Sequence, residues 1–309
     1  MILNTGLRTD IPAFYAEWFA NRLKAGFVTV RNPYDPQSVT RYRLSPDVVD
    51  VIGFCTKNPA PMLPHMDLLR PYGQYWFVTV TPYGREVEPH VPDKAEVLES
   101  FRRLSGLVGP DSTGWRYDPV FIGGRYSVGR HIEAFARMAR ALAGFTHTAV
   151  ISFIDLYAKT RRNFPEARPV APEERLALGK AFAEIARENG MTLRPCAEGD
   201  ELAVFGADCR GCMTAAVYEK AIGRRLRIPP GSAPKRECAC HLGGDIGAYN
   251  SCGHLCRYCY ANADEAAVRR NMAAHDPDSP MLIGRPMPGD RVHDAVQESW
   301  IDDQIAMEI

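Results

Sequence analysis

The residues with the most specific chemistry are three cysteines near the end of the chain. Cys252, Cys256 and Cys259 have the spacing C-x3-C-x2-C within the segment NSCGHLCRYCYAN. Three thiolates on one short loop can bind three irons of a [4Fe-4S] cluster, whereas a structural cluster is normally closed by a fourth cysteine. The spacing therefore predicts a cluster with one iron open to a small molecule.

The main alternative for this loop is a zinc site. Zinc-binding segments usually contain two pairs of the C-x2-C type. In this loop only Cys256 and Cys259 have that spacing, and Cys209 and Cys212 repeat it elsewhere. The third cysteine of the loop, together with the aromatic Tyr258 before its last cysteine, favours iron-sulfur chemistry over zinc.

Four further cysteines predict a second metal site. Cys196 ends a predicted strand, Cys212 precedes a predicted helix, and Cys238 and Cys240 form a C-x-C pair. Four thiolates can close a [4Fe-4S] cluster, and they can equally bind zinc. The sequence leaves these two alternatives open, and Cys209 competes with Cys212 or Cys196 for a place among the ligands.

The composition restricts the class of protein. The chain has 309 residues, 46% of them hydrophobic, which is typical of a folded globular protein. Lys plus Arg and Asp plus Glu number 37 each, so no broad positive field favours nucleic acid or anionic lipid. No signal peptide and no apolar run of ~18 residues is found. With nine cysteines, we expect a cytoplasmic protein with metal or redox chemistry and no membrane partner.

The elements that position these cysteines are expected to be βα units. Up to about residue 198, apolar β-branched runs alternate with amphipathic helical stretches, which predicts an α/β fold with a parallel sheet. The predicted strands are 26–31, 48–55, 75–81, 115–122, 148–154 and 192–196, and the predicted helices are 12–24, 62–69, 94–108, 130–142, 172–188 and 215–223. A TIM-like barrel, partial or full, is favoured over a doubly wound sheet with the same local pattern.

Polar residues after the predicted strands support the barrel, because barrel enzymes keep their chemistry at the carboxyl ends of the strands. Four such runs are found, at residues 32–36, 56–59, 81–83 and 155–157. We expect three parts in the chain. Residues 1–198 provide the βα barrel units, 199–262 form a Cys-rich region that binds the clusters and completes the barrel, and 263–309 form a C-terminal tail.

The cysteine loop resembles a known family. C-GHL-C-RY-C resembles the C-x3-C-x-aromatic-C signature of the radical S-adenosylmethionine (SAM) superfamily, and its flanks are similar to the spore photoproduct lyase branch. The resemblance implies that Cys252, Cys256 and Cys259 bind a [4Fe-4S] cluster whose open iron is chelated by SAM. It implies that the reduced cluster cleaves SAM to methionine and a 5'-deoxyadenosyl radical, which abstracts hydrogen from a substrate. It also places Tyr258 beside the adenine and implies an electron donor such as flavodoxin or ferredoxin.

The position of the motif departs from the superfamily, in which it follows the first barrel strand near the N-terminus. A circular permutation accounts for this difference, with residues 245–250 as the first strand and 26–31 as the second. VRNPYDP, GFCTKNP and WFVTVTPYGREVEP resemble the segments that follow the cluster loop in the lyase-like branch. The whole chain is also similar to an uncharacterised bacterial family, domain of unknown function 1848, which supplies no reaction.

Three charged residues are candidates for binding SAM. Lys57 or Arg116 could bind its carboxylate, and Glu198 could hold a SAM hydroxyl or a substrate amine. A solvated Lys57, a structural pair between Arg116 and Asp118, and a surface Glu198 explain the same positions without a ligand. Cys55 is expected to pack as a small hydrophobic residue.

Several tyrosines and histidines lie near the predicted site in the sequence. A tyrosine at the mouth could donate hydrogen, and the candidates are Tyr117, Tyr157 and Tyr249. His241 and His254 lie near the cysteines and could orient or ligate, although a single histidine is weak evidence for either.

The sequence thus predicts a radical SAM enzyme that acts on an unknown substrate, which could be a small molecule, a peptide or a nucleic-acid lesion. The alternative is a non-catalytic iron-sulfur or zinc protein that senses redox state or transfers electrons. A barrel hydrolase with a structural metal would need a carboxylate or histidine constellation that the sequence does not show.

Overall fold

The central element of the fold is a seven-stranded sheet in which every pairing is parallel. The computed structural model describes residues 1–230 and 239–302. The strand order is β8-β7-β6-β5-β4-β1-β9. The strands are β1 (Ile2–Asn4), β4 (Val51–Thr56), β5 (Gly73–Thr79), β6 (Thr113–Val120), β7 (Thr148–Phe153), β8 (Thr192–Pro195) and β9 (Gly244–Asp245). The predicted α/β fold with a parallel sheet is confirmed.

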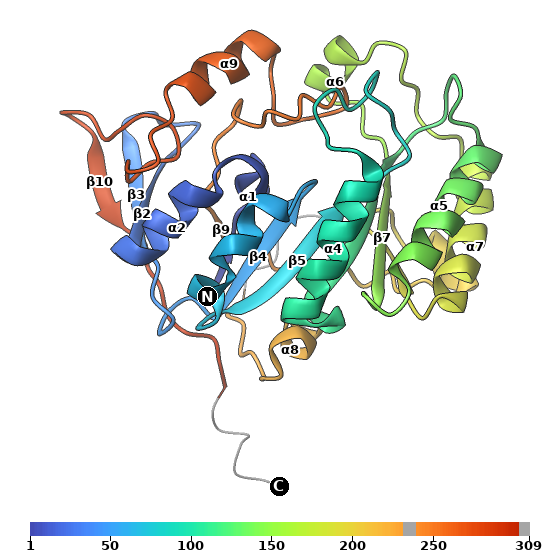
Figure 1. Ribbon diagram of the computed structural model, residues 1–309, viewed down its shortest axis with the longest axis horizontal. Coiled ribbons are helices and arrows are strands. Elements are labelled where there is room, and N and C mark those ends of the chain that lie inside the picture. Colours follow the sequence, from blue (N-terminus) through green and yellow to red (C-terminus); the bar gives the residue numbers. More distant parts are fainter. Residues whose placement is uncertain (231–238, 303–309) are drawn as a thin grey trace, which may run out of the picture.

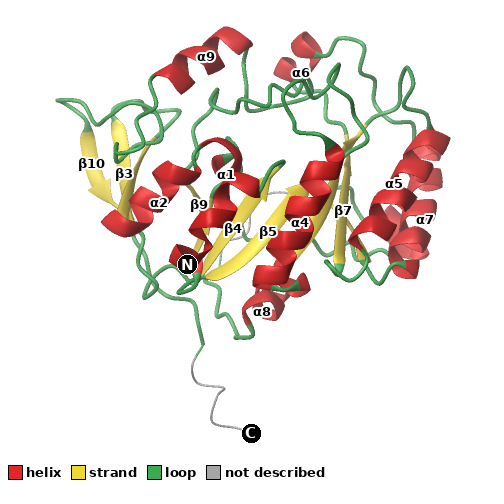
Figure 2. Cartoon of the chain, in the orientation of Figure 1, coloured by secondary structure: helices red, strands yellow, loops and turns green. Residues whose placement is uncertain are grey.

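Long amphipathic helices cover one face of this sheet (Figure 2). They are α2 (Ala16–Ala25), α4 (Lys94–Val108), α5 (Val128–Leu142) and α7 (Pro172–Glu188). Alternate strand residues point toward them, as the pleat of a strand requires. Trp115 of β6 stacks on Phe135 of α5 with ring centroids 4.5 Å apart, and Tyr117 of β6 packs edge-on against Phe182 of α7. Helices α4 and α7 begin and end at the predicted residues.

The other face of the sheet is covered by a smaller apolar cluster. Helix α8 (Ala215–Ile222) contributes Val217 and Tyr218, and the sheet contributes Val51, Tyr75 and Phe77. Cys212 and Cys240 belong to this cluster, so the Cys-rich region packs against the face opposite the long helices. This arrangement leaves the cysteines in contact with side chains of the central strands.

Shorter elements connect the strands. They are α1 (Ile11–Phe14), the 3-10 helix η1 (Ala60–His65), α3 (Met66–Leu69), η2 (Pro110–Ser112), α6 (Ala158–Asn163), η3 (Glu201–Phe205) and α9 (Glu265–Ala273). Helices α6 and α9 lie at the upper end of the molecule in Figure 1, and α8 lies at the lower end. No helix within residues 1–230 and 239–302 has the length and apolar character needed to span a membrane.

A second, three-stranded sheet contradicts one prediction. Strand β2 (Phe27–Arg31) pairs antiparallel with β3 (Ser38–Arg43), and β10 (Arg291–Asp294) pairs parallel with β3. The predicted strand 26–31 is therefore wrong as a strand of the parallel sheet. The polar run at 32–36 is the turn of this hairpin, in which Asn32 N donates to Ser38 O. It does not lie at a carboxyl end of the parallel strands.

Strand β1 takes the place that the prediction gave to residues 26–31. It pairs on one side with β4 and on the other with β9, with Asn4 opposite Asp245. The predicted strand 245–250 is short, because β9 covers only Gly244–Asp245 and Asn250 has a positive φ of 55°. In the part of the chain that the structure describes, β8 and β9 are the two edges of the sheet.

Candidate functional site

The loop with Cys252, Cys256 and Cys259 follows β9 at the carboxyl end of the sheet. Asp10 holds this loop in place through hydrogen bonds. Asp10 follows β1, caps α1 by accepting from Ala13 N at 3.1 Å, and accepts from Lys57 N at 2.8 Å. His254 of the loop lies with Nε2 3.0 Å from Asp10 Oδ2. The buried Asp10 thus ties the cysteine loop to the residues that follow β1 and β4.

The backbone of the loop is further fixed by close packing and hydrogen bonds. A Cβ atom on Gly253 would lie 2.8 Å from the ring of Phe14, so a larger residue there would require this ring to shift. Nδ1 of His90 lies 2.9 Å from Gly253 O, and Asn262 Nδ2 donates to Cys252 O at 2.9 Å. The backbone of the loop at Gly253 therefore packs directly against Phe14 and His90, a close approach that glycine allows.

The other side of the loop rests on a buried carboxylate. Glu88, which follows β5, is 1% exposed and accepts from Lys57 Nζ and Thr81 Oγ1, each at 2.8 Å. Lys94 Nζ and the hydroxyl of Tyr258 also donate to it. Neighbouring lysines and their hydrogen bonds outweigh burial and lower the pKa of Glu88 to about 2. Glu88 was not predicted as a site residue, because nothing local in the sequence separates it from an exposed loop acid.

The three thiols of the loop are neutral in the metal-free protein. Burial raises the pKa of Cys252 well above its usual value, raises the pKa of Cys256 to about 12, and raises the pKa of Cys259. Backbone N–H groups partly oppose the rise in the pKa of Cys259, since Ala261 N donates to Cys259 Sγ at 3.3 Å. Metal binding would release the thiol protons and make this loop anionic.

Cys252, Cys256 and Cys259 are a suitable donor set for a cubane cluster. No three His, Cys, Asp or Glu side chains of the described residues converge as ligands of a single metal ion. Ligands of a cubane do not need to converge, because each thiolate binds its own iron. Three cysteines on one loop are therefore a donor set of the kind that a [4Fe-4S] cluster takes.

Cys196, Cys212 and Cys240 form a second thiol group. Cys212 Sγ lies 3.6 Å from Cys196 Sγ and 3.8 Å from Cys240 Sγ, and Met213 N donates to Cys240 Sγ at 3.3 Å. Cys238 lies outside the described residues. Cys209 does not join this group, because its side chain packs against the core on the helix-covered face.

Arg116 lies beside the second thiol group rather than beside the loop with Cys252, Cys256 and Cys259. It forms an ion pair with Asp118 at 2.6 Å, and its Nη1 lies 3.9 Å from Cys212 Sγ. The ion pair between Arg116 and Asp118, which the sequence offered as an alternative to SAM binding, is therefore present. Burial raises the pKa of Cys55 to about 12, and the Arg116 charge partly opposes this rise.

Tyr260 directly follows Cys259 of the loop. Burial is the main cause that raises the pKa of its hydroxyl, and the Arg116 guanidinium, whose Nη1 lies 3.9 Å from Cys212 Sγ, partly opposes that rise. The two groups share one end of the sheet.

Glu198 lies after β8 and is held within the fold. Its Oε1 accepts from Phe153 N at 2.8 Å, and its Oε2 lies 3.2 Å from Arg175 Nη2. Burial raises the pKa of Glu198 to about 7, against the opposing effects of that N–H and of Arg175. The alternative of a surface acid is excluded by the 8% exposure of the side chain.

The raised pKa of Glu198 predicts a pH-dependent stability. A carboxyl with a raised pKa in the folded state stabilises the fold below the unfolded pKa of about 4.3, and loses that contribution as pH rises through about 7. We expect the wild type to lose more unfolding free energy than Glu198→Gln between pH ~5 and pH ~8. Urea denaturation at both pH values measures the difference, and equal losses in the two proteins would contradict the assignment.

The remaining predicted side chains are distributed over both faces. Tyr117 is wrong as a hydrogen donor at the mouth, because its ring packs between α5 and α7 and its hydroxyl lies 2.8 Å from His131 Nδ1. Tyr157 lies with its ring 6.1 Å from that of Tyr260. Tyr249 lies 5.0 Å from Lys159 Nζ, measured from the ring centroid. The last two tyrosines remain near the cysteine loop.

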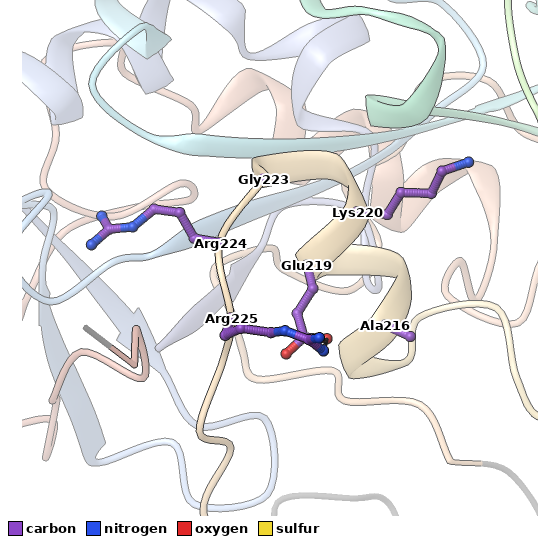
Figure 3. A pocket seen from close by; sticks show the side chains of 6 residues that line it. All are labelled: Ala216, Glu219, Lys220, Gly223, Arg224 and Arg225. Atoms are coloured by element: carbon purple, nitrogen blue, oxygen red, sulfur yellow. Dashed lines mark ion pairs between the residues drawn. The ribbon is translucent and has the colours of Figure 1, made fainter. Parts of the chain in front are cut away.

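Two surface cavities lie away from the cysteines. One of about 360 Å³ is formed by α8 and the residues after it, and Figure 3 shows the side chains of Glu219 and Arg225 meeting there, with an ion pair at 3.6 Å. Another of about 480 Å³ lies at the amino ends of β7 and β8, beside Thr148 and Thr192. Neither cavity is lined by a cysteine, so neither adds to the candidate site.

Comparison with known proteins identifies a family but no reaction. No curated protein matches the chain, and no solved structure does. The model of one family matches residues 2–261, which include the parallel sheet and both thiol groups. The chain belongs to the family described as domain of unknown function DUF1848.

Proposed function

We propose that this protein is a radical SAM enzyme whose [4Fe-4S] cluster is bound by Cys252, Cys256 and Cys259. The observation that carries the proposal is the place of the cysteine loop, which follows the edge strand β9 at the carboxyl end of a parallel sheet. Enzymes with parallel α/β sheets keep their active sites at this end. The resemblance of the loop to the superfamily signature suggests the reaction class.

The pairing of β9 with β1 supports the proposed circular permutation. In that arrangement β9 is the first strand of a partial barrel, the cysteine loop follows it, and β1 is the second strand. The remaining strands then follow in spatial order from β4 to β8. The permuted order differs from the sequence prediction only in the strand that comes second.

When bound and reduced, the cluster would supply the electron that cleaves SAM to methionine and a 5'-deoxyadenosyl radical for hydrogen abstraction. The protein's own residues hold the loop and exclude water. Asp10 fixes His254, and Glu88 fixes Tyr258. Because Lys57 Nζ is bound to Glu88 at 2.8 Å, we propose that its role is to hold the loop beside SAM rather than to bind the SAM carboxylate alone.

We propose that SAM and substrate lie between the two thiol groups, where Arg116 and Glu198 are available for contact. Both side chains already have partners, Asp118 and Arg175, so a ligand would share or exchange these ion pairs. The substrate class stays open among small molecules, peptides and nucleic-acid lesions. An electron donor such as flavodoxin or ferredoxin completes the proposed system.

An open iron is the property that separates the proposal from a non-catalytic iron-sulfur or zinc protein. We expect the anaerobically reconstituted protein to be brown, and the electron paramagnetic resonance (EPR) spectrum of its reduced cluster to change when SAM is added. Cys209→Ala, outside both thiol groups, is the matched control and should behave as the wild type. A colourless zinc protein, or a cluster whose spectrum SAM leaves unchanged, would support the non-catalytic alternative.

The second thiol group favours a single zinc ion over a second cubane. Tetrahedral zinc with Zn–S bonds of about 2.3 Å separates its sulfur ligands by about 3.8 Å. The two Sγ–Sγ distances, 3.6 and 3.8 Å, are close to this separation. Thiolates of a cubane lie farther apart, because each binds a different iron. Cys196 and Cys240 would still have to move around a common point for the metal to bind.

This distinction predicts the metal content. We expect about four irons per reconstituted chain together with zinc, and loss of only the zinc in Cys212→Ala. Elemental analysis of protein reconstituted with both metals measures the two contents. About eight irons per chain and no zinc would instead establish a second [4Fe-4S] cluster.

A further inference from the structure

Three charged side chains, Lys57, Glu88 and Lys94, form a buried charge triad beneath the cysteine loop. The Glu88 carboxylate binds both ammonium groups and also accepts from Thr81 and Tyr258. The side chain of Glu88 is fully buried, and those of Lys57 and Lys94 are 13% and 26% exposed. The triad therefore lies mostly outside the screening of bulk water.

The triad carries one positive charge in excess, because two ammonium groups share one carboxylate. A buried charge without a counter-charge is costly. Tyr258 lies between Cys256 and Cys259 in the loop, and its hydroxyl donates to Glu88, so the excess charge lies against the segment that bears the thiols. Thiolate ligands of a cluster on that loop would supply the missing negative charge.

We infer that the Lys57–Glu88–Lys94 triad is the counter-charge of the thiolate-ligated cluster and sets its reduction potential. This inference depends on the proposed function, because it needs a cluster on Cys252, Cys256 and Cys259. Tyr258 of the cysteine loop contacts two members of the triad. Its hydroxyl donates to Glu88, and the centroid of its ring lies 5.5 Å from Lys57 Nζ. A positive neighbour favours the more negative, reduced state of the cluster and makes reduction easier.

The test compares two charge-neutralising variants with opposite expected signs. In reconstituted full-length protein, Lys94→Gln removes a positive charge and is expected to shift the cluster potential to more negative values. Glu88→Gln removes a negative charge and is expected to shift it to less negative values. Redox titration followed by EPR measures both shifts. Glu96→Gln, an exposed change on the same helix, is the control and should leave the potential unchanged.

A merely structural role would give a different pattern. If the triad only supports the loop, Glu88→Gln and Lys94→Gln shift the potential in the same direction or not at all, and the inference is overturned. Lys94→Arg keeps the charge and should retain the wild-type potential, so it remains informative if Glu88→Gln does not fold. A wild-type chain that assembles no cluster would overturn the proposed function itself, and the triad would then have no cluster to tune.

Discussion

Replacing Cys256 by alanine should abolish cluster assembly while leaving the fold intact. Cys256 is buried at the centre of the loop, and its thiol makes no Sγ–Sγ hydrogen bond to another cysteine within the described residues. Removal of one of three thiolate ligands leaves two, which cannot retain a [4Fe-4S] cluster at the proposed site. We expect the visible chromophore to be lost and SAM cleavage to fall at least ~100-fold.

The control for this variant is Cys209→Ala, which should keep the wild-type chromophore and activity. Circular dichroism and thermal unfolding of the metal-free proteins establish that the fold is unchanged in both. A Cys256→Ala protein that still binds about four irons and cleaves SAM would remove Cys256 from the ligand set.

Replacing Asp10 by alanine should have the largest effect on stability. Asp10 accepts from Lys57 N at 2.8 Å and Ala13 N at 3.1 Å, and it lies 3.0 Å from His254 Nε2. Its side chain is 6% exposed, so its loss leaves buried donors unsatisfied at about 1–3 kcal/mol each. We expect the unfolding free energy to fall by about 3 kcal/mol or more, as measured by urea denaturation.

The same variant tests the link between stability and the loop. Because Asp10 connects β1, β4 and the cysteine loop, Asp10→Ala should also lose its cluster faster under a chelator than the wild type. Asp67→Ala, an exposed carboxylate on α3, is the matched control and should change neither quantity. Unaltered stability and cluster retention in Asp10→Ala would show that Asp10 does not fasten the loop.

Local pattern was sufficient for most of the parallel fold. The long helices α4 and α7 follow from their amphipathic spacing, and buried strands such as Val51–Thr56 follow from continuous apolar runs. The pattern failed at Phe27–Arg31, because a short apolar run has the same local signature in a hairpin and in a parallel sheet. Pairing partners are non-local, and three-residue β1 is too short to give a pattern.

The candidate site was predictable only where its residues share one segment. Cys252, Cys256 and Cys259 are recognised by their spacing, whereas Asp10 and Glu88 are brought to the loop by the sheet from distant positions. Spacing alone did not decide whether Cys209 competes with Cys212 or Cys196 for a place in the second thiol group, whereas in the structure its side chain packs against the core. Whether a residue joins the site depends on the tertiary fold and on the direction of its side chain, and composition and periodicity determine neither.

The most direct test of the account is the fate of SAM on the reduced protein. Anaerobically reconstituted wild type should, upon reduction by dithionite, convert SAM to methionine and 5'-deoxyadenosine, quantified by chromatography with mass spectrometry. The Cys256→Ala variant should form neither product above the level of buffer alone. A cluster-replete, reduced wild-type protein that leaves SAM intact would contradict the proposed function and support a redox-sensing or electron-transfer protein instead.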